Sequence, residues 1–124
     1  ISALHNRGIQ LAVLSNKPQP TTQKIIHAFF DAGTFSAVFG QREGVPLKPD
    51  PAGVFEILEL LHRQKQECLY IGDTAGDIKT GKSAGLTTVG VLWGFRDRAE
   101  LEGAGATHII AKPSELLQLA TVIR

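Results

Sequence analysis

Short apolar runs alternate along the chain with longer segments in which apolar residues recur at helical spacing. The short runs cover residues 9–14, 35–39, 68–71, 87–92 and 107–110 and are typical of buried strands. Helical spacing is clearest at Val54, Phe55, Leu58 and Leu61, within an expected helix over residues 52–62. This alternation, repeated about five times, predicts an α/β fold with a mostly parallel sheet and helices on both faces.

Glycine and proline mark the expected ends of these elements. Residues 1–7 are expected to be the last turns of a helix that Gly8 stops. Pro18 is expected to end the first strand region, and a helix is expected to begin at Thr21 or Thr22. Further helices are expected up to Gly85, over residues 97–101 and from residue 113 to the end.

The third strand leads into a pair of carboxylates. Its sequence, LYIGDTAGDI, places Asp73 and Asp77 four residues apart, just after Gly72 and at the start of a helix. Carboxylates at the carboxyl end of a strand attract a hard cation such as Mg²⁺. A simpler role fits the same residues, because Asp73 or Thr74 can cap the helix and Asp77 can favour its positive end.

Two other strand-end loops carry groups suited to phosphate. Ser15 and Asn16 follow the first strand, and a hydroxyl group and free backbone N–H groups there can hold phosphate oxygens. Lys48 precedes a Pro-Asp-Pro segment and supplies a positive point charge. Each is also compatible with a plain turn or a solvated lysine. Together with the two acids, however, they predict phosphate chemistry at one edge of the sheet.

Composition excludes several other classes of protein. The 124 residues suit one domain, and a net charge of +1 gives no basic surface for nucleic acid. No apolar run approaches the length of a membrane span, and the single cysteine excludes an internal disulfide, so we expect a cytoplasmic protein. The four histidines show no metal-ligand spacing, and no G-x-G-x-x-G follows a strand, which argues against a dinucleotide-binding domain.

These motifs together resemble the haloacid dehalogenase superfamily, and within it the phosphoglycolate phosphatase-like proteins. Residues 14–17, LSNK, resemble the second motif of the family, and residues 48–51, KPDP, the third. GDTAGD at residues 72–77 resembles the fourth, and residues 90–95, Glu100-Leu101 and residues 113–117 resemble the tail of the phosphoglycolate phosphatase branch. The resemblance covers essentially the whole chain and implies a Rossmann-like three-layer sandwich.

The resemblance also implies roles for individual residues. Ser15 and Asn16 would bind the phosphoryl group, and Lys48 would be both a phosphate-binding and a catalytic residue. Asp73 and Asp77 would hold Mg²⁺, with Asp77 acting directly or through water. The implied reaction is hydrolysis of a small phosphorylated metabolite through an aspartyl-phosphate. Two alternatives remain open: a non-catalytic phosphate-binding or assembly module, and a phosphotransferase such as a sugar-phosphate mutase.

One motif of the family is absent from these residues. The chain contains no Asp-x-Asp, whose first Asp is the family's nucleophile and whose position is the end of the central strand. We expect that strand and the cap to lie upstream of Ile1, so that this chain is the C-terminal portion of the core domain and is inactive alone. The sheet should then have a central gap between residues 9–14 and 68–71, to be filled by an upstream segment or a second chain.

Overall fold

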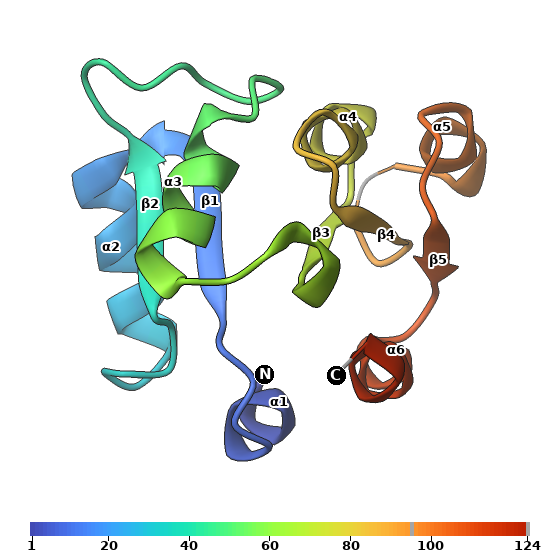
Figure 1. Ribbon diagram of the computed structural model, residues 1–124, viewed down its shortest axis with the longest axis horizontal. Coiled ribbons are helices and arrows are strands. Elements are labelled where there is room, and N and C mark those ends of the chain that lie inside the picture. The colour runs from blue at the N-terminus through green and yellow to red at the C-terminus, as the bar shows by residue number, and fades with distance from the viewer. Residues whose placement is uncertain (95, 124) are drawn as a thin grey trace.

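The computed structural model describes residues 1–94 and 96–123, with the side chains of residues 1–94 and 96–119. Strands and helices alternate in the predicted order (Figure 1). The strands are β1 (Ala12–Pro18), β2 (Ala37–Gln41), β3 (Leu69–Gly72), β4 (Thr87–Val91) and β5 (His108–Ile110). The helices are α1 (Ser2–Asn6), α2 (Gln19–Phe29), α3 (Ala52–Leu61), α4 (Ala75–Ser83), α5 (Arg98–Gly103) and α6 (Leu116–Ile123), with 3-10 turns η1 (Lys65–Glu67) and η2 (Pro113–Glu115).

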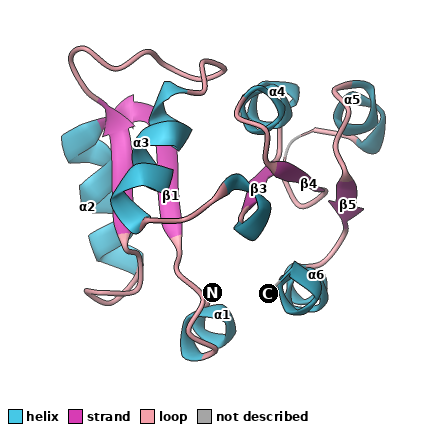
Figure 2. Ribbon diagram, in the orientation of Figure 1, coloured by secondary structure: helices cyan, strands magenta, loops and turns pink. Residues whose placement is uncertain are grey.

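All strand pairs are parallel, but they form two separate sheets. β1 pairs with β2, and β3, β4 and β5 form a three-stranded sheet in that order. Among the described strands, β1 and β3 are not paired with each other, and Figure 2 shows the two sheets as separate groups. The predicted α/β class and the gap between these two strands are therefore confirmed.

The space between the sheets is a cleft of about 800 Å³, which we call the central cleft. It is lined from one side by Ala12 and Leu14 of β1 and from the other by Tyr70 and Ile71 of β3. Ile71 remains 42% exposed although it lies in a strand. The edges of β1 and β3 therefore face each other across an apolar-lined cleft. This is the arrangement expected of a single sheet from which one central strand is missing.

Helices hold together the two halves of the molecule, which are the β1–β2 sheet and the β3–β4–β5 sheet. Val54 of α3 is buried against Leu14 of β1, and the same cluster includes Tyr70 of β3. On the other face of the second sheet, α6 packs through Leu116 on β4 and β5. The Arg7 guanidinium, just after α1, donates a hydrogen bond to a carbonyl oxygen of α6 at 3.3 Å. The halves thus stay together without strand pairing.

The first strand differs from its prediction at both ends. β1 begins at Ala12 and runs through Pro18, which was expected to end the first strand region, so Ser15 and Asn16 lie inside β1 and not after it. The register between β1 and β2 shifts between Leu14 and Pro18, and proline is tolerated at such irregularities and at strand ends. α2 likewise begins at Gln19 instead of Thr21 or Thr22, because Pro20 lies in its first turn, where no N–H partner is needed.

Apolar spacing did not determine which side chains are buried. Phe29 of α2 is 77% exposed and Phe55 of α3 is 41% exposed, although both fit the helical pattern. The Lys65 ammonium group lies beside Phe55, 5.3 Å from the centre of the Phe55 ring. The described helices include none that is long and apolar enough to cross a membrane.

Candidate phosphate and metal site

Lys48 joins the two halves of the molecule at one end of the central cleft. Its ammonium group donates hydrogen bonds to the backbone oxygen of Leu14 in β1, at 3.3 Å, and to Oδ1 of Asp77 in α4, at 2.9 Å. The side chains of Lys48 and Asp77 are only 19% and 15% exposed. A positive charge is thereby fixed between Leu14 of β1 and the start of α4, close to the carboxyl end of β3, and carboxyl ends of strands are where a parallel sheet binds its ligands.

The Asn16 side chain fixes the backbone of Lys48. Its Oδ1 accepts a hydrogen bond from Lys48 N at 3.0 Å, and its Nδ2 donates to Lys48 O at 3.3 Å. The neighbouring Ser15 Oγ accepts a hydrogen bond from Lys17 N at 3.1 Å, which leaves its hydroxyl hydrogen free to be donated to a ligand. Of the two residues, Ser15 is therefore the one whose side chain suits a phosphate oxygen.

The loop that carries Lys48 is also attached to α3. Arg42 and Glu56 form a bidentate ion pair with N–O distances of 2.7 and 2.9 Å. The Arg42 guanidinium also lies over the Phe39 ring, 4.1 Å from its centre. Bidentate geometry restrains the orientation of both partners. The loop between β2 and α3 is thus held at its start by Arg42 and at Lys48 by Asn16.

The acidic turn between β3 and α4 is held by its own side chains. Thr74 is the N-cap of α4, with its Oγ1 accepting from Asp77 N at 3.1 Å, so capping is carried out by Thr74. Oδ2 of Asp77 accepts from Asp73 N at 3.2 Å. A Cβ atom at Gly72 would collide with the Asp77 side chain, so the turn needs glycine there.

Burial and charge act in opposite directions on Asp77. Burial by itself raises the pKa of this carboxyl group, because a charged form is poorly solvated there. The Lys48 ammonium, and then the N–H of Asp73 and the hydroxyl of Thr74, outweigh burial and hold the pKa below its usual value. Asp77 is therefore ionised at neutral pH. Burial raises the pKa of the nearby Tyr70 hydroxyl, and the negative charge of Asp77 adds to that shift.

Two carboxylates at this site, those of Asp73 and Asp77, are possible ligands for Mg²⁺. The residues that the structure describes include no group of three or more His, Cys, Asp or Glu side chains arranged around one point. Mg²⁺ nevertheless binds through one or two carboxylates and keeps several waters. Asp73 and Asp77, both lining the central cleft, fit that limited requirement. Because both oxygens of Asp77 already accept hydrogen bonds, Asp73 is better placed for direct contact.

Of the predicted site residues, Lys48, Asp73 and Asp77 line the central cleft, whereas Ser15 and Asn16 line a smaller hollow that also includes Lys48. Lys48 contacts Asp77 directly and Asn16 contacts Lys48, so three separated motifs meet. No sequence pattern predicted the contact that Glu100 of α5 makes with the backbone of Ala75. Trp93, also at the cleft, is 49% exposed. Phe95, one of the residues on which the family resemblance rests, lies outside the described residues.

Comparison with known proteins identifies the family. A profile of haloacid dehalogenase-like hydrolases matches residues 1–85. The chain belongs to the haloacid dehalogenase-like hydrolases. The phosphoglycolate phosphatase of Aquifex aeolicus is 34% identical over 119 residues, which are 96% of this chain and 54% of that protein. The pyrophosphatase PpaX of Listeria monocytogenes is 31% identical over 96% of this chain and 55% of its own length.

A solved crystal structure has a similar fold. It comes from Lactobacillus delbrueckii subsp. bulgaricus and is predicted to be a phosphoglycolate phosphatase. The TM-score is 0.89 at 32% sequence identity, over 96% of this chain and 49% of that one. The chain thus spans about half the length of the relatives that it matches. The expected superfamily and its phosphoglycolate phosphatase-like branch are confirmed.

Proposed function

We propose that this chain forms the phosphate- and Mg²⁺-binding part of a phosphatase that hydrolyses a small phosphate monoester such as phosphoglycolate. The observation that carries the proposal is the position of the Lys48 ammonium group, between Leu14 of β1 and Asp77 of α4. Relatives over almost the full length of this chain are named as phosphatases.

In this proposal each described residue has a separate task. The Ser15 hydroxyl and the backbone N–H of Asn16 bind phosphate oxygens, and Lys48 neutralises their charge. Asp73 and Asp77 would hold Mg²⁺, and the bound ion would add positive charge against the phosphate. Asn16 keeps Lys48 in place. Phosphoryl transfer depends mainly on such positioning and electrostatic stabilisation.

The nucleophile would come from a strand in the central cleft. β1 and β3 present facing edges, and a strand between them would complete a parallel sheet. We propose that this strand belongs to a segment upstream of Ile1 or to a second chain, and that its carboxyl end brings an Asp to Lys48. That Asp would attack phosphorus, the alcohol would leave, and water would then hydrolyse the aspartyl-phosphate. Residues 1–124 alone would not turn over.

Hydrogen exchange on the native protein tests the strand. If the cleft is filled, the amides of β1 and β3 that face it will exchange about as slowly as those of the central strand β4. The matched comparison is β5, a strand at the edge of its sheet. Exchange of the cleft-facing amides as fast as at the free edge of β5 would contradict a filled cleft.

The intact mass of the native protein, with sequencing upstream of Ile1, tests whether the nucleophile is present. A heavier chain with an Asp-x-Asp motif supports a phosphatase. Its hydrolysis of phosphoglycolate should then be measured beside pyrophosphate, with and without a chelator, because one relative is named as a pyrophosphatase. A native protein that binds phosphate, has no such motif and shows no turnover would instead be a non-catalytic binding module.

A further inference from the structure

A carboxylate from α5 contacts the turn that carries the two acids of the site. Oε2 of Glu100 accepts a hydrogen bond from the backbone N of Ala75 at 2.8 Å. Ala75 is the first residue of α4, directly between Asp73 and Asp77 in sequence. The acidic turn is therefore held by α5, which follows the next strand, as well as by its own side chains.

Glu100 is itself held in a fixed position. Its neighbour Leu101 is fully buried, and it packs so closely on β4 that a Cβ at Gly90 would lie 3.1 Å from Leu101 Cδ1. Asp97 caps α5 by accepting a hydrogen bond from Glu100 N at 2.9 Å. Glu100 thus reaches the acidic turn from a helix anchored in the core.

The contact completes a set of hydrogen bonds around the turn. Asp73 N donates to Asp77, Ala75 N donates to Glu100, and Asp77 N donates to Thr74. With these N–H groups bonded to protein, the backbone has little freedom to rotate the two carboxylates away from the cleft. On the other side, a Cβ at Gly94 would collide with Asp73.

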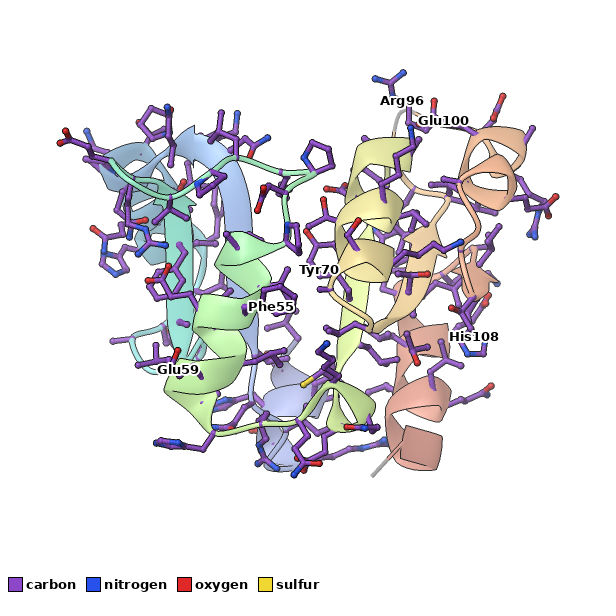
Figure 3. The ribbon with its side chains drawn as sticks, turned by 45° about the horizontal axis from the view of Figure 1, so that its top comes forward. Phe55, Glu59, Tyr70, Arg96, Glu100 and His108 are labelled. Carbon is purple, nitrogen blue, oxygen red and sulfur yellow. The ribbon has the colours of Figure 1, made fainter. Side chains whose placement is uncertain are left out.

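Glu100 also forms an ion pair at the surface, and this pair differs in its effect from the hydrogen bond to Ala75. Oε1 of Glu100 lies 3.5 Å from Arg96, whose side chain is 54% exposed, and Figure 3 shows the two residues together at the edge of the molecule. Exposed pairs of this kind contribute little to stability. They do offset charge, so Arg96 reduces the repulsion between Glu100 and the site carboxylates. The contact with Ala75, not the ion pair, is what connects Glu100 to the site.

We propose that Glu100 is a positioning residue for the divalent cation that Asp73 and Asp77 would hold. The inference rests on the proposed function, because it needs that cation site to exist. Groups that orient metal ligands without touching the metal commonly change metal affinity 10- to 100-fold when they are removed. We expect Glu100→Ala to raise the dissociation constant for Mg²⁺ at least about tenfold.

The test is direct Mg²⁺ titration of the native protein, by calorimetry and by Trp93 fluorescence, without substrate. Glu102→Ala is the matched control, because Glu102 pairs with Arg98 on the same helix at 3.6 Å. It should bind Mg²⁺ as the unmodified protein does. Glu100→Gln should bind nearly as well, because its amide oxygen can still accept from Ala75 N. Hydrogen exchange at Ala75 should be faster in Glu100→Ala than in Glu102→Ala or Glu100→Gln.

Two further results decide the proposal. If Glu100→Ala does not fold, Glu100→Asp keeps the charge but shortens the side chain, and it should also weaken Mg²⁺ binding. A folded Glu100→Ala or Glu100→Asp with unchanged Mg²⁺ affinity would overturn the positioning role and leave the proposed function intact. An unmodified protein with no Mg²⁺ affinity would overturn the cation site of the proposed function itself.

Discussion

Asn16 and Lys48 hold each other through two hydrogen bonds, from Lys48 N to Asn16 Oδ1 at 3.0 Å and from Asn16 Nδ2 to Lys48 O at 3.3 Å. The residues are 32 positions apart in the sequence. An amide side chain can accept from a backbone N–H through its oxygen and donate to a backbone C=O through its nitrogen at the same time. The position of the Lys48 ammonium group is therefore set from β1.

We expect Asn16→Ala to weaken phosphate binding. The effect would be indirect, because the Asn16 side chain holds the backbone of Lys48 and would not itself contact phosphate. Its two hydrogen bonds are exposed to solvent, so their loss should lower the free energy of unfolding by only about 1 kcal/mol. Urea unfolding and titration of the native protein with inorganic phosphate measure the two effects. Asn6→Ala, at an exposed position in α1, is the control. Equal phosphate affinity in both variants would show that the hydrogen bonds between Asn16 and Lys48 do not contribute to phosphate binding.

Lys48→Ala should have the largest effect on the reaction. Removing one group that stabilises the charge of a transition state commonly lowers kcat about 100- to 1,000-fold. The measurement is kcat and KM of the native enzyme with phosphoglycolate. Lys79→Ala removes the same charge from an exposed position of α4 and should leave both constants unchanged. The role assigned to Lys48 fails if the two variants have similar kcat values.

Asp77 should make stability depend on pH in the acid range. Its pKa is depressed below 3.8 in the folded protein, because Lys48 and the Asp73 N–H outweigh burial. A depressed pKa stabilises the fold above the unfolded value, and that stability is lost as the pH falls through the folded pKa. Asp77→Asn should therefore destabilise the protein more at neutral pH than below pH 3.8.

The comparison needs an aspartate outside the site. Asp31→Asn changes an exposed aspartate and should shift the urea midpoint little at either pH. If Asp77→Asn shifts the midpoint equally at both pH values, the ion pair with Lys48 is not what stabilises the fold.

Gly94 should be required for metal binding although it has no side chain. A Cβ at this position would collide with the Cβ and Oδ2 of Asp73, so Gly94→Ala should displace that carboxylate. We expect Mg²⁺ affinity to fall about tenfold, as when other supporting contacts of metal ligands are lost. Gly103→Ala is the control, because a Cβ there meets no atom within 4 Å. Unchanged affinity for Mg²⁺ in Gly94→Ala would place Asp73 outside the metal site.

Local patterns predicted the elements well and their ends less well. The order of strands and helices, the α3 range to within one residue and the position of GDTAGD across the start of α4 follow from periodicity and glycine placement. Pro18 was misjudged because its strand pairing depends on a register shift against β2, which is a property of two strands. The second strand was expected over residues 35–39 but runs over Ala37–Gln41, so Gly40 lies inside β2.

The sequence by itself determined which groups are available for chemistry: Ser15, Asn16, Lys48, Asp73 and Asp77. Tertiary structure decided what each one contacts. It placed Asn16 on the backbone of Lys48, Lys48 on Asp77, and Glu100 on Ala75. These pairs are separated by 25 to 32 residues, so no local spacing contains them. They arise because parallel strands with crossover helices bring distant loops to one edge of a sheet.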